Sequence, residues 1–436
     1  MNRLMHKKVM LITLGCPKNE ADSEILAGML ADGGMTLVDS SDEADAILIN
    51  TCGFIDSAKE ESIETILDAV ALKKTSRKSV YVWGCLSERY KGEIEKEIPE
   101  VDGYFGVESF EAIGRLLLGP TSRWNDSFYT KRVFPALPHT AYLKIAEGCN
   151  HGCHFCAIPL FKGRYRSRTM DSLIAEASSL AEKGVREIIL IAQDTTLYGH
   201  DLGMNRGLPG LFEELVRIQG IDWIRLMYTH PSHLSNDILD VMAREEKICA
   251  YLDMPLQHIA DPVLEKMGRR TSRKSIETVL TNVRSRIPNI ALRTAFIVGF
   301  PGETEEHFTE LLDFIEEQRF HRLGVFAYSQ EEGTRAYELG PGAPQSVAEE
   351  RVEILMTAQQ AISESNNEAL EGSVLDVLID GYDTEQDLSF GRSRSDAPEV
   401  DQTIWVQGEL PAGQIVPVRI EGSSTYDLIG RLQQEK

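Results

Sequence analysis

Short apolar runs alternate with helix-like stretches along the first part of the chain. The runs VMLITL, AILIN and SVYVWG have the pattern of buried strands. The segment EADSEILAGMLADGG has helical spacing and closes on Gly33 and Gly34. Strands separated by helices favour a parallel sheet with crossover connections. We therefore predict an α/β domain with a doubly wound parallel sheet over residues 1–125.

A second α/β region follows a stretch without periodicity. Residues 120–141 are rich in Pro and Ser and predict a linker, which we place at 126–140. Alternation then resumes over residues 141–366, where the strand candidates are REIILIAQ, WIRLMYTHP, CAYLDMPLQH, IALRTAFIVGFPG and RLGVFAYSQ. This pattern predicts a parallel sheet or barrel whose active residues lie on the loops that follow the strands.

The last region, residues 367–436, changes character. Its runs SVLDVLID, DLSFGRS, QTIWVQ and QIVPVRIEG are short, strand-like and separated by turn residues. They predict a small all-β barrel. The longest apolar stretches of the whole chain reach only about ten residues, about half of what crosses a bilayer. The first apolar run leads into GCPKN without a cleavage site. We therefore expect no membrane association and a cytoplasmic location.

Composition adds a constraint on the cysteines. The chain has seven cysteines, and in a reducing compartment such thiols stay free, bind metal or take part in chemistry. Three of them, Cys16, Cys52 and Cys85, each follow a predicted strand and each stand beside a glycine. Loops after parallel strands share one rim of the sheet, so these thiols are expected to converge on a shared ligand. Burial as ordinary core residues is the alternative.

Three more cysteines lie within thirteen residues, EGCNHGCHFCAIP. Cys149, Cys153 and Cys156 have the spacing C-x3-C-x2-C. Three thiols in one compact loop can hold three corners of an iron–sulfur cube and leave the fourth iron open, which marks a reactive site. A structural zinc site completed by His151 or His154, and an electron-carrying cluster, are the alternatives.

This thirteen-residue motif resembles the signature of radical S-adenosylmethionine (SAM) enzymes. The resemblance implies that the three cysteines hold a 4Fe-4S cluster whose open iron binds SAM. One electron from the cluster then cleaves SAM to a 5′-deoxyadenosyl radical, which removes hydrogen from an unactivated carbon. The cofactors supply this chemistry, while the protein supplies geometry and excludes water.

The resemblance extends over nearly the whole chain. LGCPKNEADSE, NTCGFIDSAKEES and GCLSERY resemble the amino-terminal domain of methylthiotransferases, and later blocks such as LDMPLQHIADPVLEKMGRR and YSQEEGTRAY resemble the same family. This implies a second 4Fe-4S cluster on Cys16, Cys52 and Cys85 that carries the sulfur to be inserted. A second SAM supplies the methyl group. It also implies a central partial TIM-like barrel and a carboxyl-terminal, OB-like TRAM domain. Cys249 matches no ligand position, and we expect it to be a buried strand residue.

Several residues around the chemistry are candidates for cofactor binding. Gly299 and Gly302, in FIVGFPGETEE, would let adenosine or ribose approach the backbone, or simply form a strand-to-helix loop. Gln193 directly follows a predicted strand at the rim where the radical would form. For His230 and His233, in YTHPSHL, hydrogen bonding is favoured over metal binding.

Charge bears on the choice of substrate. The family modifies adenosine in transfer RNA (MiaB-like members) or an aspartate of small-subunit ribosomal protein twelve (the RimO branch). Residues 366–436 contain 5 Lys plus Arg and 14 Asp plus Glu, a net of −9, within a chain of net charge −23. Such a surface repels RNA and favours a basic protein. General acidity of a soluble protein is the alternative explanation.

Resemblance also favours the RimO branch. QDTTLYG, YSQEEGT and GRSRSDAPEVDQTIWV are similar to that branch, which implies methylthiolation of the aspartate β-carbon. Asp396, Glu399 and Asp401 are the candidates for contacting the substrate. A flavodoxin or ferredoxin is the expected electron donor, and nucleic-acid binding is not expected. The alternatives are a tRNA methylthiotransferase and a non-catalytic two-cluster electron carrier or redox sensor.

Overall fold

The computed structural model describes residues 7–134 and 139–433, in two compact units. The first unit covers Met1–Ala136, Tyr142–Asn150 and Ala157–Leu180, and the second covers Leu137–Ala141, His151–Cys156 and Ala181–Lys436, each in its described part. Within the predicted linker 126–140, residues 126–131 form a 3-10 helix, and residues 135–138 lie outside the described residues.

A five-stranded parallel sheet forms the centre of the first unit. Its strands are β1 (Lys8–Thr13), β2 (Thr36–Leu37), β3 (Ala46–Thr51), β4 (Ser79–Gly84) and β5 (Gly103–Phe105), in the order β2-β1-β3-β4-β5. Every pair of neighbours is parallel. The order reverses between β1 and β3, as in a doubly wound sheet, and the predicted class is confirmed. The sequence pattern did not reveal β2 and β5, which have only two and three residues.

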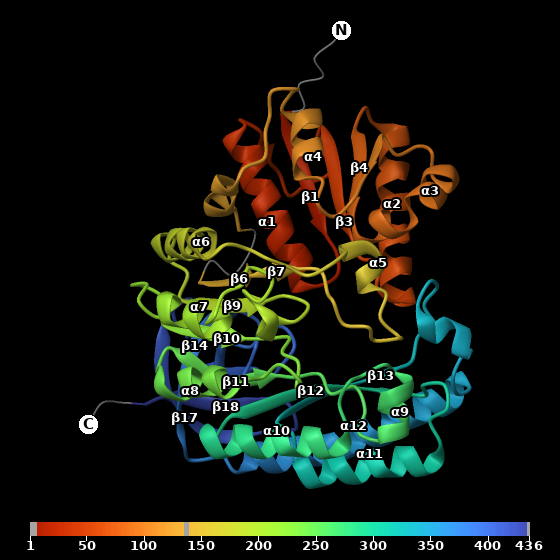
Figure 1. Ribbon diagram of the computed structural model, residues 1–436. Helices are drawn as coiled ribbons and strands as arrows, with labels where there is room; N and C mark the ends of the chain where they lie inside the picture. Colours follow the sequence, from red (N-terminus) through yellow and green to blue (C-terminus); the bar gives the residue numbers. More distant parts are fainter. Residues whose placement is uncertain (1–6, 135–138, 434–436) are drawn as a thin grey trace. The chain divides into compact units, whose positions relative to one another are not determined.

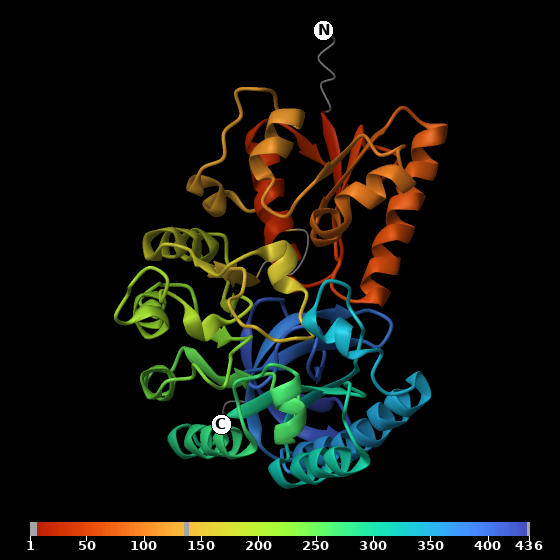
Figure 2. The ribbon, with the colours of Figure 1, turned by 45° about the vertical axis from the view of Figure 1, so that its right-hand side comes forward.

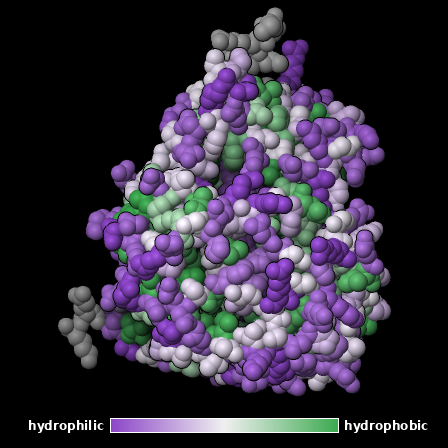
Figure 3. All heavy atoms as spheres, in the orientation of Figure 1, coloured by the Kyte–Doolittle hydropathy of each residue, from purple (hydrophilic) through white to green (hydrophobic). Residues whose placement is uncertain are grey.

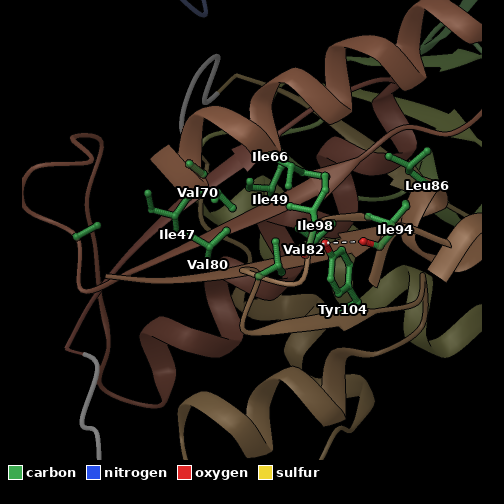
Figure 4. Close-up of a cluster of buried hydrophobic side chains, with 13 residues drawn as sticks. Ile47, Ile49, Ile66, Val70, Val80, Val82, Leu86, Ile94, Ile98 and Tyr104 are labelled. Atoms are coloured by element: carbon green, nitrogen blue, oxygen red, sulfur yellow. Dashed lines mark hydrogen bonds between the residues drawn. The ribbon is translucent and has the colours of Figure 1, made fainter. Parts of the chain in front are cut away.

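Helices cover both faces of this sheet (Figure 1). On one face α1 (Pro17–Asp32) and α4 (Phe110–Leu117) pack against alternate strand residues such as Leu48 and Trp83. On the other face α2 (Asp56–Thr75) and α3 (Cys85–Glu97) pack against the intervening ones, among them Ile49 and Val82 (Figure 4). Because successive strand side chains point to opposite faces, an unbroken apolar strand is buried on both sides.

The first unit also contains a group of buried ion pairs. They involve residues of α1, of β6 (Thr140–Lys144), of β7 (Ala146–Glu147) and of the short helix α5 (Ile158–Lys162). Lys144 Nζ contacts Asp22 and lies 2.9 Å from Glu147 Oε2, and Lys162 Nζ lies 3.3 Å from the same oxygen. These opposite charges compensate one another, as buried charges must. The segments on either side of the C-x3-C-x2-C loop are thereby fastened to α1. The remaining elements are β8 (Arg166–Ser167), which pairs with β7, and α6 (Met170–Glu182).

The second unit contains parallel strands β9 (Glu187–Ile191), β10 (Trp223–Leu226), β11 (Ile248–Asp253), β12 (Ala291–Val298) and β13 (Arg322–Ala327), adjacent in that order. Helices alternate with them: α7 (Gly207–Leu215), α8 (Asn236–Arg244), α9 (Asp261–Lys266), α10 (Arg273–Arg286), α11 (Glu305–Gln318) and α12 (Gln345–Glu368). An open row of parallel strands with crossover helices agrees with the predicted class. Cys249 lies in β11 with 0% of its surface exposed, as expected.

A closed barrel follows α12 within the second unit. Its strands are β14 (Val374–Asp383), β15 (Leu388–Ser393), β16 (Ile404–Gln407), β17 (Ile415–Ser423) and β18 (Leu428–Leu432), in the order β14-β15-β16-β18-β17. Figure 2 shows these strands in blue around a common interior, which buried side chains such as Val377, Ile404 and Val418 fill. The predicted barrel is confirmed, with β18 as an additional strand.

The visible surface is largely hydrophilic. On the face shown in Figure 3, hydrophilic residues predominate and apolar ones are scattered. Among the described residues, every helix is too short or too polar to cross a membrane.

Candidate functional site

The three strand-end cysteines of the first unit lie at one rim of its sheet. Cys16 directly precedes α1, Cys52 directly follows β3, and Cys85 directly follows β4 as the first residue of α3. Because β1, β3 and β4 are neighbours in the sheet, their carboxyl ends bring the three loops together. This rim includes the point where the strand order reverses, which is where open α/β sheets bind ligands.

Glycines allow these loops to approach closely. A Cβ added to Gly15, which has φ +93°, would lie 2.8 Å from Cys52 Cβ and 3.1 Å from Cys52 Sγ. A Cβ added to Gly53 would lie 2.7 Å from the Cα of Leu86, the residue after Cys85. A side chain at either position would push the thiol-bearing loops apart. Gly15 and Gly53 therefore let the thiol-bearing loops pack closely against one another.

Asn19 connects the same three loops. Its Nδ2 donates to Leu14 O at 2.8 Å and to Thr51 O at 3.3 Å, while the Cys85 thiol donates to its Oδ1 at 3.8 Å. Asn19 was not predicted as a site residue. Its place three residues after Cys16, in the first turn of α1, was the only signal of this role in the sequence.

Two of the thiols at this rim, those of Cys52 and Cys85, are buried. Burial raises the pKa of Cys85 to about 12, although the nearby Lys162 ammonium acts in the opposite direction. Burial also raises the pKa of Cys52. Both thiols are therefore protonated at neutral pH until an electrophilic metal takes the place of the proton. Three convergent free thiols with a nearby cation form a donor set that fits an iron–sulfur cluster.

The C-x3-C-x2-C loop runs from β7 to α5. Within the first unit, Cys149 N donates to Gly163 O at 3.1 Å. Gly148 has φ +79°, and a Cβ there would lie 2.2 Å from Arg164 O, so only glycine permits this close approach. Within the second unit, Cys156 N donates to Cys153 O at 3.2 Å, which forms a tight turn between these two cysteines. Among the described residues, none of the three cysteines is in a disulfide bond, as a cluster ligand set requires.

The segment from His151 to Cys156 is fixed to the loop after α9. His154 N donates to Met267 O at 2.8 Å, and the His154 ring donates to Lys266 O at 2.9 Å. A guanidinium N–H of Arg269 reaches Cys153 Sγ at 3.8 Å. The sequence left open whether Arg269, which follows a helical stretch, is a solvated surface charge.

Three histidines and an aspartate form a partly buried cluster at this segment. His151 Nε2 donates to Asp194 Oδ2 at 2.7 Å, and His233 Nδ1 donates to the same oxygen at 3.0 Å. The His230 ring stacks on that of His151 with centroids 4.2 Å apart. Although burial opposes it, hydrogen bonds from His151, His233 and Thr196 hold the pKa of Asp194 well below its usual range. The contact of His151 with Asp194 was not predicted, because the two residues are far apart in the sequence.

The four ligand atoms of this cluster lie within 4.8 Å of one another, which raises the question of a metal. Ser232 N donates to His230 Nδ1 at 3.2 Å, so that nitrogen is an acceptor. Burial lowers the pKa of His230 to about 2, with Arg269 adding to the effect, so the ring is neutral. Its proton is therefore on Nε2, and neither nitrogen is free to bind an ion. These contacts form a hydrogen-bonded network, and the absence of a metal ion from it stays a prediction.

The predicted cofactor residues lie at the carboxyl ends of strands in the second unit. Gln193 follows β9, and Gly299 and Gly302 follow β12 with φ of +75° and +86°. A Cβ on Gly299 would lie 2.9 Å from Ala348 Cβ, so this turn requires glycine for its own geometry. Contact of these three residues with SAM stays a prediction.

Two of the three predicted substrate residues are engaged inside the second unit. The Asp396 carboxylate lies 2.5 Å from Arg322 Nη2 and its side chain is 1% exposed. Asp401 accepts from the Tyr251 hydroxyl at 2.7 Å. Glu399 is exposed and has φ +65°. Because Asp396 and Asp401 fix the barrel to the sheet, Glu399 is the member whose side chain is accessible, and substrate contact stays a prediction.

Comparison with known protein families matches three models along the chain. Residues 8–106 match "Uncharacterized protein family UPF0004", residues 143–315 match the radical SAM superfamily, and residues 372–432 match the TRAM domain. The fold and the triple-cysteine loop therefore define a radical SAM enzyme, a class that uses S-adenosylmethionine and a 4Fe-4S cluster.

Two curated relatives are similar over nearly the full length. The chain is 48% identical over 429 residues to the ribosomal protein uS12 methylthiotransferase RimO of Aquifex aeolicus (strain VF5), covering 97% of both chains. It is 46% identical over 432 residues to the RimO of Chloroherpeton thalassium (strain ATCC 35110 / GB-78), covering 98% of both. The chain belongs to the RimO family of methylthiotransferases.

Solved structures of radical SAM enzymes share the fold. The radical S-adenosylmethionine methyltransferase TsrM from Kitasatospora setae, with cobalamin and a [4Fe-4S] cluster bound, matches with a TM-score of 0.55 and 14% identity over 85% of this chain and 81% of that chain. A second TsrM structure, with tryptophan substrate and a SAM analogue bound, has a TM-score of 0.54 and 15% identity over 73% of each chain. At this identity the likeness concerns the fold alone.

Proposed function

We propose that this protein methylthiolates the β-carbon of an aspartate in ribosomal protein uS12. The observation that carries the proposal is the identity of 42–48% to RimO proteins over nearly the entire chain. Both sets of three cysteines support it, because sulfur insertion by a radical enzyme requires a radical source and a sulfur source. The relatives favour uS12 over transfer RNA, and a non-catalytic carrier is disfavoured by membership of an enzyme family.

Each set of thiols has its own role in this proposal. Cys149, Cys153 and Cys156 hold the cluster that reduces SAM, and Cys16, Cys52 and Cys85 hold the cluster that presents sulfur. The first cluster supplies, when bound, the electron that cleaves SAM to a 5′-deoxyadenosyl radical. The residues of this chain then bind and orient SAM and the aspartate and exclude water. Gln193, Gly299 and Gly302 are proposed for SAM.

Charge on the barrel supports a protein substrate. The net charge of −9 over residues 366–436 lies on a domain whose basic residues are partly engaged internally: Arg392 is 4% exposed and bonds to Glu187 and Asp380. Fewer cations are therefore left for RNA phosphates than the sequence count implies. An acidic surface accelerates encounter with a basic protein, and Glu399 is its proposed contact at the turn before β16.

A one-electron donor must reduce the first cluster. We assign this role to a flavodoxin or ferredoxin, since SAM cleavage consumes one electron that the chain does not itself supply. Anaerobic stopped-flow spectroscopy of cluster reduction by each purified donor tests the assignment. Reduction by neither donor contradicts it.

The substrate assignment has a direct test. The reconstituted protein is incubated anaerobically with SAM, sulfide and reductant, together with either uS12 or unmodified transfer RNA, and both macromolecules are examined by mass spectrometry. We expect one methylthio group in place of one hydrogen on a uS12 aspartate and none on the RNA. A methylthio group on the nucleotide alone contradicts the proposal.

A further inference from the structure

Arg269 is a buried cation beside a proposed cluster ligand. It lies between α9 and α10, and its side chain and backbone together are 9% exposed. Its Nη1 donates to Cys153 Sγ at 3.8 Å, and its Nη2 donates to Pro255 O at 2.6 Å. Its Nε is buried and has no hydrogen-bond partner among the described residues. The Pro255 carbonyl therefore holds the guanidinium in an orientation in which it donates to the Cys153 sulfur.

The backbone around Arg269 is built for this approach. Gly268 has φ +67°, and a Cβ there would lie 2.6 Å from the His154 ring and 2.8 Å from Gly152 O. Arg269 N donates to Leu264 O at 2.9 Å, which ends α9 in a tight turn. Glycine at position 268 thus allows the loop that carries Arg269 to pack directly on the segment that carries Cys153.

The charge of Arg269 is not compensated by a carboxylate. In the part of the chain that the structure describes, no Asp or Glu oxygen pairs with this guanidinium, and its hydrogen-bond partners are the Pro255 carbonyl and the Cys153 sulfur. A buried cation without a counter-ion is costly, so such sites usually contain an anion when in use. A cysteine that binds iron does so as a thiolate, and this is the anion that Arg269 faces.

We propose that Arg269 is a positioning residue for the radical-generating cluster, donating a charge-assisted hydrogen bond to the Cys153 thiolate and raising the reduction potential of the cluster. The proposal rests on the assignment of Cys153 as a cluster ligand. Reduction adds one electron, from the external donor, to an already anionic centre. A fixed cation at the ligand sulfur stabilises the reduced state more than the oxidised state, and arginine itself is unchanged. Cluster reduction is the step that precedes SAM cleavage, so Arg269 makes this step easier.

The neighbouring residue is a matched control. Arg270 has the same charge one position along the chain and is exposed. Water and salt screen an exposed charge, so its removal has little effect on a buried centre. Arg269→Gln, Arg269→Lys and Arg270→Gln are therefore compared in the full-length protein with both clusters reconstituted. Iron content and circular dichroism confirm loading and folding.

Potentiometric titration monitored by electron paramagnetic resonance is the first measurement. We expect Arg269→Gln to shift the midpoint of the SAM-binding cluster to lower potential, so that about tenfold less cluster is reduced at a fixed potential, which corresponds to about 59 mV for one electron. Arg269→Lys keeps the charge but loses the planar fork, and should give a smaller shift. Arg270→Gln should match the wild type. An unchanged midpoint in a fully loaded Arg269→Gln protein overturns the proposal.

The second measurement uses the wild-type protein and does not depend on the folding of a variant. Arginine is labelled with the heavy nitrogen isotope, and pulsed electron paramagnetic resonance of the reduced cluster detects coupling to the guanidinium. We expect this coupling in the wild type and in Arg270→Gln, and its loss in Arg269→Lys. Absence of coupling in the wild type overturns the proposal. Neither measurement uses uS12, so failure here is distinct from failure of the substrate assignment.

Discussion

Arg392 in the barrel and Glu187 in the parallel sheet form a buried ion pair, with Nη1 2.7 Å from Oε2. The side chains are 5% and 0% exposed. Arg225 approaches the other oxygen of Glu187 at 2.8 Å, and Asp380 lies 2.7 Å from Arg392 Nε. Two arginines and two carboxylates thus compensate one another. Because Arg392 and Asp380 belong to the barrel and Glu187 and Arg225 belong to the sheet, this network fixes the barrel to the sheet of the second unit.

Removing Arg392 should destabilise the second unit. Arg392→Met leaves Glu187 and Asp380 with one cation fewer in a buried setting, and breaking a buried pair in this way costs about 3 to 5 kcal/mol. We expect the free energy of unfolding from urea titration to fall by that amount. Arg431→Met, which removes an exposed partner of Glu421, is the control and should change stability by less than about 1 kcal/mol. Equal effects of the two substitutions would contradict the structural role of the network.

The same network should make the protein sensitive to acid. Although burial opposes it, Arg392 and Arg225 hold the pKa of Glu187 below its usual range, and His139 and Arg392 do the same for Asp380. A carboxyl group whose pKa is lowered by folding adds stability at pH values above its unfolded-state pKa, which is about 4.3 for Glu and about 3.9 for Asp. This contribution is lost as the pH falls through the folded-state values. We expect urea midpoints to drop below about pH 4, and to drop less in Arg392→Met. A parallel pH dependence in both proteins would refute this origin.

Asn19 should be needed for loading of the second cluster. Asn19→Ala removes the amide that joins the loops after β1 and β3, and leaves buried carbonyl groups without a donor, at a cost of about 1 to 3 kcal/mol. We expect iron content after reconstitution to fall from about eight atoms per chain towards four, with SAM cleavage retained. The control is Asn282→Ala, since Asn282 is a half-buried residue on α10 whose side chain bonds to the side chains of Asn236 and Arg286. Full iron content in Asn19→Ala would show that the loops hold their positions without it.

The histidine cluster should not bind a divalent ion. His230 keeps its proton on Nε2, and the other three groups already satisfy one another around Asp194. We expect protein reconstituted with both clusters and then incubated with zinc to retain less than one zinc per chain after gel filtration, and His233→Ala to retain the same amount. If the wild type retains one zinc per chain and His233→Ala loses it, the cluster is a metal site and the prediction is wrong. Zinc that persists in both would point to the cysteines.

The long elements of the fold were predictable because their patterns are local. Alternating apolar runs and helical stretches gave the strands around Ile49 and Val82, and regularly spaced short runs gave most of the barrel. Elements of two or three residues, such as β2 and β5, carry too little pattern to be detected. β18, Leu428–Leu432, was missed because it has only five residues and its apolar ones are interrupted by Gly430 and Arg431.

Site residues could be proposed from the sequence where a spacing implies chemistry. Cysteines at fixed intervals or at strand ends indicate metal ligation, and the glycines beside them indicate that backbone comes close to a neighbouring group. Arg269 and Asn19 act through partners that are distant in sequence, and nothing local distinguishes them from surface or helix residues. The sequence also did not reveal that the Asp396 and Asp401 carboxylates bond to Arg322 and Tyr251, and contact of this motif with substrate stays a prediction.

The division of labour between the two sets of cysteines is the central claim, and paired variants test it most directly. Cys16→Ala/Cys52→Ala/Cys85→Ala and Cys149→Ala/Cys153→Ala/Cys156→Ala are reconstituted without oxygen and given SAM, reductant and uS12. We predict that the first variant forms 5′-deoxyadenosine but leaves uS12 unmodified, and that the second does neither. Methylthiolated uS12 from the first variant, or 5′-deoxyadenosine from the second, would contradict the account.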